Sequence, residues 1–323
     1  MKSLSLVAIG TILFNTAHAL VLTSVAPNGV VEVTATEADD IVVSFEGNAL
    51  LINNLEPSNA PITVDQIKGL NLIGSDDPNT IDFTRFNHPN LKMVYRMNVI
   101  ANGGDDSVLG NNISRVINYE TNYIDLGSGN NTLNLENSPI IFFVIKNDLL
   151  ANDTIVGTNL DLNFVWRLDD SGSAHNSTIA IRQNETDSAF IDVVYDNGTV
   201  SSTSKLRGIN LVDIKCSNGD QVINVSDFEN DAVNEITYNF GNGNNTINTP
   251  FLKNVKQQII GSDSESSIDT LNFVSGAILL DHDLEQRVLE THLAQGYVVY
   301  NSVENIKINS QDIDVTSNSW GVR

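Results

Sequence analysis

Short apolar stretches with polar residues at alternate positions recur along this chain, and tight polar turns separate them. A typical unit runs from Leu72 to Phe83, where a turn rich in glycine and aspartate separates Leu72-Ile73 from Ile81. Alternation with a period of two is the pattern of β-strands, and glycine, asparagine and aspartate are the residues that sharp turns favour. Long stretches with helical periodicity are nearly absent. The pattern therefore predicts strands joined by tight turns.

These turns recur at a regular interval. They start near residues 74, 103, 127, 152, 217, 241, 261 and 309, so the short intervals are 20 to 29 residues long. The two longer gaps, of 65 and 48 residues, are close to three and two short intervals. A repeat in the twenties is typical of one solenoid coil, which buries its apolar face only by stacking on its neighbours. We therefore predict an all-β solenoid of the parallel β-helix or β-roll type. A tandem β-sandwich is the alternative that strand signals leave open.

Two stretches match each other over a longer span. Residues 124–135 and 238–249 share the pattern Gly-x-Gly-Asn-Asn-Thr at an offset of 114 residues, and at the same offset Asp106 meets Asp220 and Val108 meets Val222. The match predicts a repetitive solenoid over residues 66–323 with two related halves, 66–200 and 201–323. Residues 20–65 would then form N-terminal strands or a cap.

One segment near the C-terminus departs from the β pattern. Apolar residues spaced like one face of a helix lie within it: Leu284, Val288, Leu289 and Leu293. Asp281 and Asp283 are suited to cap the start of a helix, and Gly296 is suited to end it. The spacing predicts one short helix over residues 283–295, packed on the solenoid near its C-terminal end.

The first residues have the features of a secretory signal peptide. A charged start at Lys2 precedes an apolar run from Leu6 to Phe14 and an Ala-His-Ala sequence that ends at Ala19. The apolar run is shorter than the roughly 20 residues that span a bilayer, and no later segment is apolar enough to span one. We therefore expect residues 1–19 to be removed and the protein to be secreted. It would act outside the cell, at the cell surface or in the periplasm.

Charge and cysteine content narrow the range of partners. The chain carries 17 basic and 40 acidic residues, a net charge of −23, so it should be repelled by nucleic acids and by anionic lipid headgroups. Such a chain is suited to binding cations or to staying solvated. Cys216 is the only cysteine, so stability must come from burial and backbone ladders rather than from an internal disulfide.

Several turns carry a glycine- and asparagine-rich phrase. Residues 126–134 read L-G-S-G-N-N-T-L-N and residues 240–248 read F-G-N-G-N-N-T-I-N, while residues 101–109 read A-N-G-G-D-D-S-V-L. These phrases resemble the haemolysin-type (RTX-like) calcium-binding repeats of secreted bacterial toxins, adhesins and surface-layer proteins, G-G-x-G-x-D-x-U-x. Asn131 and Asn245 stand where the family has its aspartate, and Asp106 keeps it. The family stacks its phrases in tandem, whereas here each stands alone.

The resemblance implies a parallel β-roll that binds calcium at its turns. Calcium takes several oxygen ligands, carboxylates among them. The candidate ligands are Asp105 and Asp106, followed by Asp76 and Asp77. Solvated turn carboxylates are the alternative interpretation of the same residues.

A catalytic interpretation starts from Asp82 and Asp105, which lie one predicted coil apart in Asn-Thr-Ile-Asp and Gly-Asp-Asp sequences. These sequences resemble part of the polygalacturonase-like β-helix pattern, in which paired carboxylates serve as acid and base. The Gly-His-Gly and Arg-x-Lys triplets of that family are missing from the sequence, as are other common catalytic motifs. We therefore expect a non-catalytic structural or adhesive surface protein. Its partners would be itself, other cell-surface components or glycans. The alternatives are a soluble calcium- or glycan-binding exoprotein and a β-helix enzyme that degrades polysaccharides.

Overall fold

The protein is almost entirely β-structure in its computed structural model. The structure describes residues 21–57, 61–91, 94, 96–110, 122–136, 138, 142–147, 151–157, 163–228, 233–262, 267–274, 280–283, 288–291, 297–301, 303, 305–308 and 311–313. The predicted signal peptide, residues 1–19, lies outside these residues. One 3-10 turn, η1 (Val64–Gln66), interrupts the strands, and no helix in the described residues is long and apolar enough to cross a membrane.

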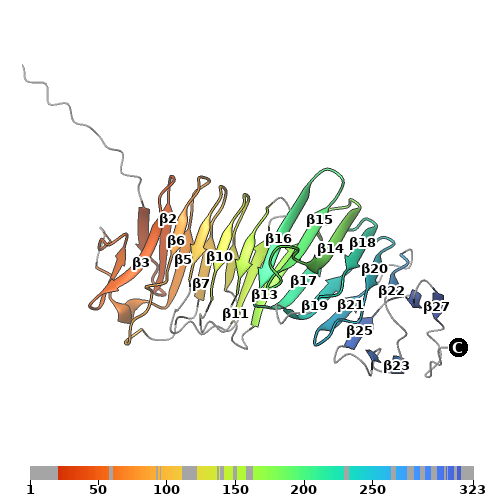
Figure 1. Ribbon diagram of the computed structural model, residues 1–323. Helices are drawn as coiled ribbons and strands as arrows, with labels where there is room; N and C mark the ends of the chain where they lie inside the picture. The colour runs from red at the N-terminus through yellow and green to blue at the C-terminus, as the bar shows by residue number, and fades with distance from the viewer. Residues whose placement is uncertain are drawn as a thin grey trace, which may run out of the picture.

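The strands form two long sheets (Figure 1). Sheet A has 13 strands in the order β1 (Val21–Val25), β2 (Val30–Ala35), β5 (Gly69–Ile73), β7 (Arg96–Ile100), β9 (Tyr123–Asp125), β11 (Phe142–Asn147), β13 (Asn163–Asp169), β17 (Ile209–Lys215), β19 (Val233–Asn239), β21 (Lys256–Ile260), β25 (Tyr297–Asn301), β24 (Val288–Thr291) and β23 (Leu280–Asp283). Sheet B has 14 strands in the order β27 (Gln311–Ile313), β26 (Asn305–Ile308), β22 (Thr270–Phe273), β20 (Thr246–Thr249), β18 (Gln221–Val225), β14 (Ser177–Gln183), β15 (Ile191–Asp196), β16 (Ser201–Arg207), β12 (Thr154–Val156), β10 (Thr132–Asn134), β8 (Ser107–Leu109), β6 (Thr80–Asp82), β3 (Ile41–Glu46) and β4 (Ala49–Ile52).

The chain runs alternately through the two sheets and so winds into a solenoid. Along sheet A, Leu72 lies opposite Val99 in parallel register, and Val99 lies opposite Ile124. Equivalent positions in successive coils are 27, 25, 22 and 24 residues apart. The predicted coil length in the twenties is confirmed, and the long parallel ladders decide for the solenoid over the β-sandwich alternative.

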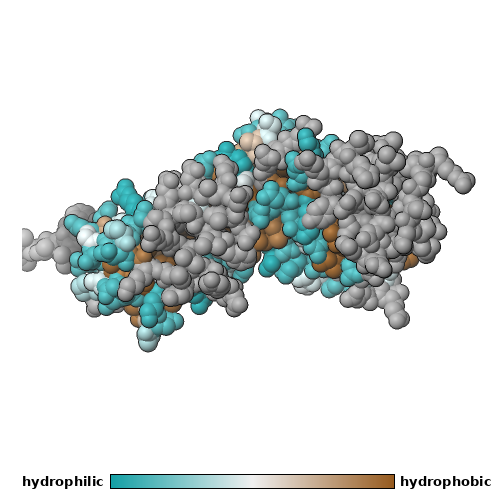
Figure 2. Space-filling view, turned by 90° about the horizontal axis from the view of Figure 1, so that it is seen from below, coloured by the Kyte–Doolittle hydropathy of each residue, from teal (hydrophilic) through white to brown (hydrophobic). Residues whose placement is uncertain are grey.

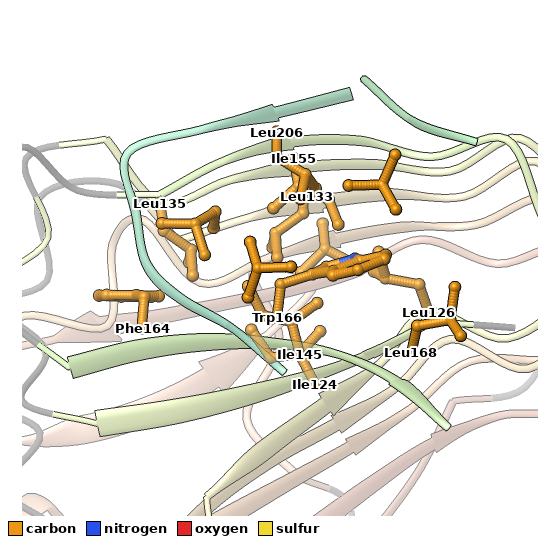
Figure 3. Close-up of a cluster of buried hydrophobic side chains, with 14 of the residues drawn as sticks. Ile124, Leu126, Leu133, Leu135, Ile145, Ile155, Phe164, Trp166, Leu168 and Leu206 are labelled. Carbon is orange, nitrogen blue, oxygen red and sulfur yellow. The ribbon is translucent and has the colours of Figure 1, made fainter. Parts of the chain in front are cut away.

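The space between the sheets is filled by columns of apolar side chains that repeat from coil to coil. In sheet B the column includes Ile81, Val108 and Leu133, each fully buried. In sheet A, Ile124, Ile145 and Trp166 lie opposite one another in the same way. The Trp166 side chain fills the interior between the two sheets (Figure 3). Full burial of one such aliphatic side chain contributes about 1.5–3 kcal/mol, so stacking is the main source of stability.

The predicted turns occupy one particular corner of each coil, the connection from a strand of sheet A to the next strand of sheet B. The turn starts near 74, 103, 127, 152, 217, 241 and 261 all lie on this corner. The turn near 309 lies outside the described residues. Sharp corners need left-handed backbone, and Asn102 (φ 71°) and Gly127 (φ 69°) supply it at the same place in successive coils.

A three-stranded insertion explains the 65-residue gap between turns. After β13 the chain forms β14, β15 and β16 as an antiparallel meander within sheet B. Parallel stacking resumes on both sides, because β16 pairs with β12 and β14 pairs with β18. The gap therefore holds one widened coil, whose β15–β16 hairpin rises above the neighbouring corners in Figure 1. The boundary drawn between the two halves, after residue 200, falls inside this hairpin.

Antiparallel strands end both sheets. At the N-terminal end β1 pairs with β2 and β4 pairs with β3, and at the C-terminal end β24 and β27 pair with β25 and β26. The predicted helix over residues 283–295 is wrong in its described part, because Leu280–Asp283 and Val288–Thr291 are antiparallel strands. An isolated helix of this length is marginal, whereas the open edge of sheet A offers the segment a full set of backbone partners.

Candidate functional site

Polar side chains at the corners bond one coil to the next from inside the solenoid. We call them the inner corner column: Asn79, Asp106, Asn131 and Asp153 before the insertion, and Gln221, Asn245 and Asp269 after it. All seven are at most 3% exposed. The Oδ1 atom of Asp106 accepts the main-chain N–H of Asn79 at 2.7 Å, and Asn131 Oδ1 accepts that of Asp106 at 2.9 Å. Asp153, Asn245 and Asp269 accept a main-chain N–H of the preceding coil in the same way, so five of the seven side chains satisfy a buried N–H group there.

The residues just before five members of this column form a second, outer corner column that bonds in the opposite direction: Asp105, Asn130, Asn152, Asp220 and Asn244. Asp105 Oδ1 accepts the main-chain N–H of Asn130, in the following coil, at 2.8 Å. In the C-terminal part, Asp220 Oδ1 accepts that of Asn244 at the same distance. Two adjacent corner residues therefore connect three coils, one backward and one forward.

The structure separates the four candidate calcium ligands. Asp106 is buried in the inner column, whereas Asp105 is exposed in the outer column and bonds to the following coil. Asp76 and Asp77 are exposed on the preceding corner. Within the described residues, no three histidine, cysteine, aspartate or glutamate side chains are grouped to hold a metal ion. Asp105 and Asp106 each accept a main-chain N–H through Oδ1, and calcium binding at these corners stays a prediction.

Burial perturbs the ionisation of Asp106 in the inner corner column. Burial raises the pKa of its carboxyl group from 3.8 to about 6, while the hydrogen bond from Asn79 opposes this shift and the nearby charge of Asp105 adds to it. Its Oδ2 atom is buried without a hydrogen-bond partner. At the equivalent place, the amide Nδ2 of Asn131 donates to Gly127 O and that of Asn245 donates to Gly241 O. An asparagine thus satisfies this position better than an ionised aspartate.

The corner bonds also correct the alignment of the two halves. Asn130 bonds to Asp105 as Asn244 bonds to Asp220, so Asp105 is the structural equivalent of Asp220. Asp106 then corresponds to Gln221, since each gives its N–H to the next column member. The sequence offset that paired Asp106 with Asp220 is wrong by one residue at this coil. A shift of one residue in this alignment exchanges the side chains that point into the solenoid with those that point out of it.

The outer face of sheet B carries rows of small polar side chains. A hydroxyl row runs through strands paired in register and contains Thr80, Ser107, Thr132 and Thr154, with Thr246 and Thr270 beyond the insertion. Two residues further along the strands, Asn272 Nδ2 donates to Asn248 Oδ1 and Asn248 Nδ2 donates to Asn224 Oδ1, each at 2.9 Å. Within these stretches, similar small polar groups recur at the strand spacing of about 4.8 Å.

The outer face of sheet A instead carries ion pairs between neighbouring strands. Arg167 Nε lies 2.7 Å from Asp213 Oδ2, and Lys256 Nζ lies 2.7 Å from Glu235 Oε1. Such partly exposed pairs contribute at most about 1 kcal/mol each. These two pairs connect charges of neighbouring coils on this face.

Sequence reasoning missed one polar cluster, where the insertion meets the corner after β13. Tyr195 donates to Asp170 Oδ2 at 2.9 Å, and His175 Nε2 lies 2.5 Å from the Tyr195 hydroxyl and 3.0 Å from Asp170 Oδ2. Burial, followed by the contact with Asp170, raises the pKa of Tyr195. No local sequence motif indicates this cluster, because Tyr195 reaches the corner only when the insertion folds back onto it. It holds the meander to the stack.

The two carboxylates of the catalytic interpretation have local partners. Asp82 Oδ1 accepts the main-chain N–H of Thr84 at 2.9 Å and its hydroxyl at 2.7 Å, so it closes its own turn. Asp105 bonds to the following coil. Cys216 is a free, buried thiol, and burial raises its pKa.

The protein is a capped, two-sheeted parallel β-solenoid. Asparagine and aspartate side chains at its corners form hydrogen bonds between coils. No protein-family model, curated protein or solved structure matches the chain. The surface chemistry of the rod is therefore the basis for its function.

Proposed function

We propose that this protein is a non-catalytic, secreted structural or adhesive rod. The observation that carries the proposal is that corner side chains bond coil to coil in both directions, as Asp106 does to Asn79 and Asp105 does to Asn130. These polar groups are committed to the stack. They make a long, stiff element without disulfides, which suits a protein that spans a distance or displays a surface outside the cell.

The rod would act at a surface, with itself, other cell-surface components or glycans as partners. Its net charge of −23 keeps it solvated and away from nucleic acids and anionic membranes. Calcium at the acidic corners would strengthen contacts between rods by reducing this repulsion.

Light scattering and negative-stain microscopy of the exported protein test the structural role, with calcium and with chelator in parallel. Rods that assemble into ordered lattices or filaments, or that coat a cell-wall preparation, would support the proposal. A monodisperse particle that binds no surface component in either condition would contradict it.

The outer face of sheet B favours glycan binding as a second candidate function. Its hydroxyl and amide rows are neutral and evenly spaced, which suits hydrogen bonding to a linear, uncharged polysaccharide. Titration calorimetry with such polysaccharides should give saturable binding that Asn248→Ala weakens. The matched control is Asn239→Ala on the opposite sheet, which should bind like the wild type. Equal loss in both variants would contradict this face as the binding surface.

A further inference from the structure

A hydroxyl and a carboxamide are enclosed together inside the solenoid, where the insertion meets the next coil. Ser177, the first residue of β14, lies opposite Gln221, the first residue of β18, in parallel register. The Ser177 hydroxyl donates a hydrogen bond to Gln221 Oε1. Hydrophilic residues make up much of the described surface in Figure 2, whereas Ser177 is only 5% exposed and Gln221 is fully buried. A nucleophilic oxygen and an acyl group are thus held in contact away from water.

Gln221 also departs from its neighbours in the inner corner column. Asn131 and Asn245 use their side-chain oxygen to accept a main-chain N–H of the preceding coil. Gln221 Oε1 instead has the Ser177 hydroxyl as its partner. Gln221 Nε2 donates to His175 O at 3.0 Å, so the carboxamide is fixed at both ends with its carbonyl against Ser177. This corner therefore presents an amide to a hydroxyl rather than to the backbone.

A chain of proton-carrying groups adjoins this pair. The hydroxyl of Ser177 is also hydrogen-bonded to that of Tyr195. Tyr195 donates to Asp170 Oδ2 at 2.9 Å, and His175 Nε2 lies 3.0 Å from the same carboxylate oxygen. The His175 side chain is 36% exposed, so the chain reaches from the buried serine to solvent. A hydroxyl becomes a nucleophile when a neighbouring base accepts its proton, and this arrangement supplies that base.

We propose that Ser177 and Gln221 form an intramolecular ester that joins the widened coil covalently to the next coil. Ser177 Oγ attacks Cδ of Gln221, and a C–O bond replaces the C–N bond of the carboxamide. The Ser177 proton passes to Tyr195 as Tyr195 passes its own to Asp170 or His175. The nitrogen takes up one proton and leaves as ammonia. One hydroxyl and one carboxamide thus give one ester and one ammonia, and no oxidant, reductant or cofactor is consumed.

The folded chain supplies what this reaction needs. A carboxamide reacts slowly with a hydroxyl, but groups held in contact reach effective concentrations of about 10⁵ M or more. Ammonia is lost to dilute solution, and burial of both residues shields the ester from water. The closed loop, residues 177–221, contains the insertion, so the insertion stays attached when hydrogen bonds between coils open. The bond is independent of the partners of the rod and does not rest on the proposed function.

A second buried hydroxyl–carboxamide pair provides an internal control. Thr249 Oγ1 donates to Gln257 Oε1 at 2.7 Å, and both residues are at most 1% exposed. The hydroxyl of Tyr238 lies 3.4 Å from Gln257 Oε1. In the part of the chain that the structure describes, no carboxylate or imidazole bonds to either residue of this pair. The contact is similar but the base is missing, so we expect this pair to stay unlinked.

Intact-mass spectrometry of the unfolded exported protein, followed by a tryptic digest, measures the bond. The wild type should be lighter than its sequence by one ammonia, about 17 Da. Cleavage after arginine and lysine should release residues 168–182 and 216–253 as one linked pair of peptides. A succinimide at an Asn–Gly sequence also loses ammonia but links no peptides, so the digest distinguishes the two reactions.

Three variants assign the roles of the groups. Ser177→Ala should have the full mass of its sequence and release the two peptides separately, whereas the matched control Thr249→Val should keep the loss of about 17 Da. Tyr195→Phe keeps both reacting groups but interrupts the proton path, so it should form the ester about a hundredfold more slowly in samples taken at intervals after synthesis. Circular dichroism verifies that each variant keeps the strand content of the wild type.

The ester is overturned by a wild type that has the full mass of its sequence. A gain of about 1 Da would overturn it as well, because water would then have attacked Gln221 in place of Ser177. So would a loss of ammonia that persists in Ser177→Ala. An unchanged rate in Tyr195→Phe would overturn the proton path. A chain without the ester can still assemble or coat a surface, so the proposed function is judged separately by its own assays.

Discussion

Replacing Asp106 by asparagine tests how the inner corner column is held together. Asp106 is 2% exposed, its Oδ1 accepts the N–H of Asn79, and its Oδ2 is buried without a partner. At the equivalent place Asn131 keeps the same acceptor bond and donates from its amide to Gly127 O. The substitution therefore keeps the acceptor, removes a buried charge and adds a donor.

The pKa of Asp106 sets the size and the sign of the effect. Its carboxyl pKa is about 6 in the folded protein against an ordinary 3.8, so between these values the folded state holds the proton more tightly than the unfolded state. The contribution of Asp106 to the free energy of unfolding then falls as the pH rises through this window, and it levels off above it. The total loss is about 3 kcal/mol, at about 1.4 kcal/mol for each pH unit between the two pKa values. Asparagine does not titrate, so D106N should be more stable than the wild type by up to about 3 kcal/mol at pH 8 and nearly equal to it at pH 4.

Urea unfolding followed by circular dichroism at pH 4, 6 and 8, in chelator, measures this difference. D105N is the matched control, because it removes a charge one residue away at an exposed acceptor, and it should change the free energy of unfolding by less than about 1 kcal/mol. N131D makes the reverse change in the next coil and should destabilise the protein at pH 8 but not at pH 4.

A D106N variant that is less stable than the wild type at pH 8 would refute this reasoning, because the ionised carboxylate would then make a stabilising contact. Repeating the titration in calcium identifies that contact. A calcium-dependent gain in wild-type stability that D106N lacks would establish Asp106 as a calcium ligand, as the resemblance to haemolysin-type repeats predicts.

Three further substitutions test the packing of the coils. Gly127→Ala should cost about 3 kcal/mol or more, because a Cβ there would lie 1.5 Å from Asn102 O on a left-handed backbone, whereas Gly172→Ala meets nothing within 4 Å and should be nearly neutral in the same urea assay. Trp166→Ala should cost about 3–5 kcal/mol by opening a cavity between the sheets, and a loss under about 1 kcal/mol in calorimetry would contradict its place in the core. Tyr195→Phe should cost about 1–3 kcal/mol and raise amide hydrogen exchange in residues 177–207 before the rest of the stack; uniform exchange would contradict a local role.

Local chemistry explains why the coil corners could be predicted. A corner needs left-handed backbone, which glycine and asparagine adopt at little cost, so Gly104, Gly129 and Gly243 mark the same place in three coils with φ of 99°, 121° and 117°. The spacing of these residues then gives the coil length. The widened coil could not be predicted, because a 65-residue gap is also the length of three plain coils. Which strand neighbours which depends on stacking partners far along the chain.

The direction in which each corner side chain points also could not be predicted from the sequence. Asp105 and Asp106 are chemically identical neighbours, yet one is exposed and the other is buried. Their roles follow from the register of stacking, and a shift by one residue exchanges them. The C-terminal strands show the same limit: β24 pairs with β25 and β23 pairs with β24, although the spacing of apolar residues in this segment predicted a helix.

The order of asparagine and aspartate in the inner column has a physical reason of its own. Stacked coils bring equivalent positions to about 4.8 Å from each other, so an aspartate at every corner would place buried like charges side by side. The column instead alternates Asn79, Asp106, Asn131 and Asp153, and Asn245 precedes Asp269. Alternation doubles the separation of the carboxylates to about 10 Å, and Asp106 lies between two neutral side chains, those of Asn79 and Asn131. A column with a cation at every turn would tolerate an uninterrupted run of aspartates, because the cation neutralises them. The alternation in this chain therefore fits a stack held mainly by its own hydrogen bonds, with Asp106 as a corner at which pH affects stability.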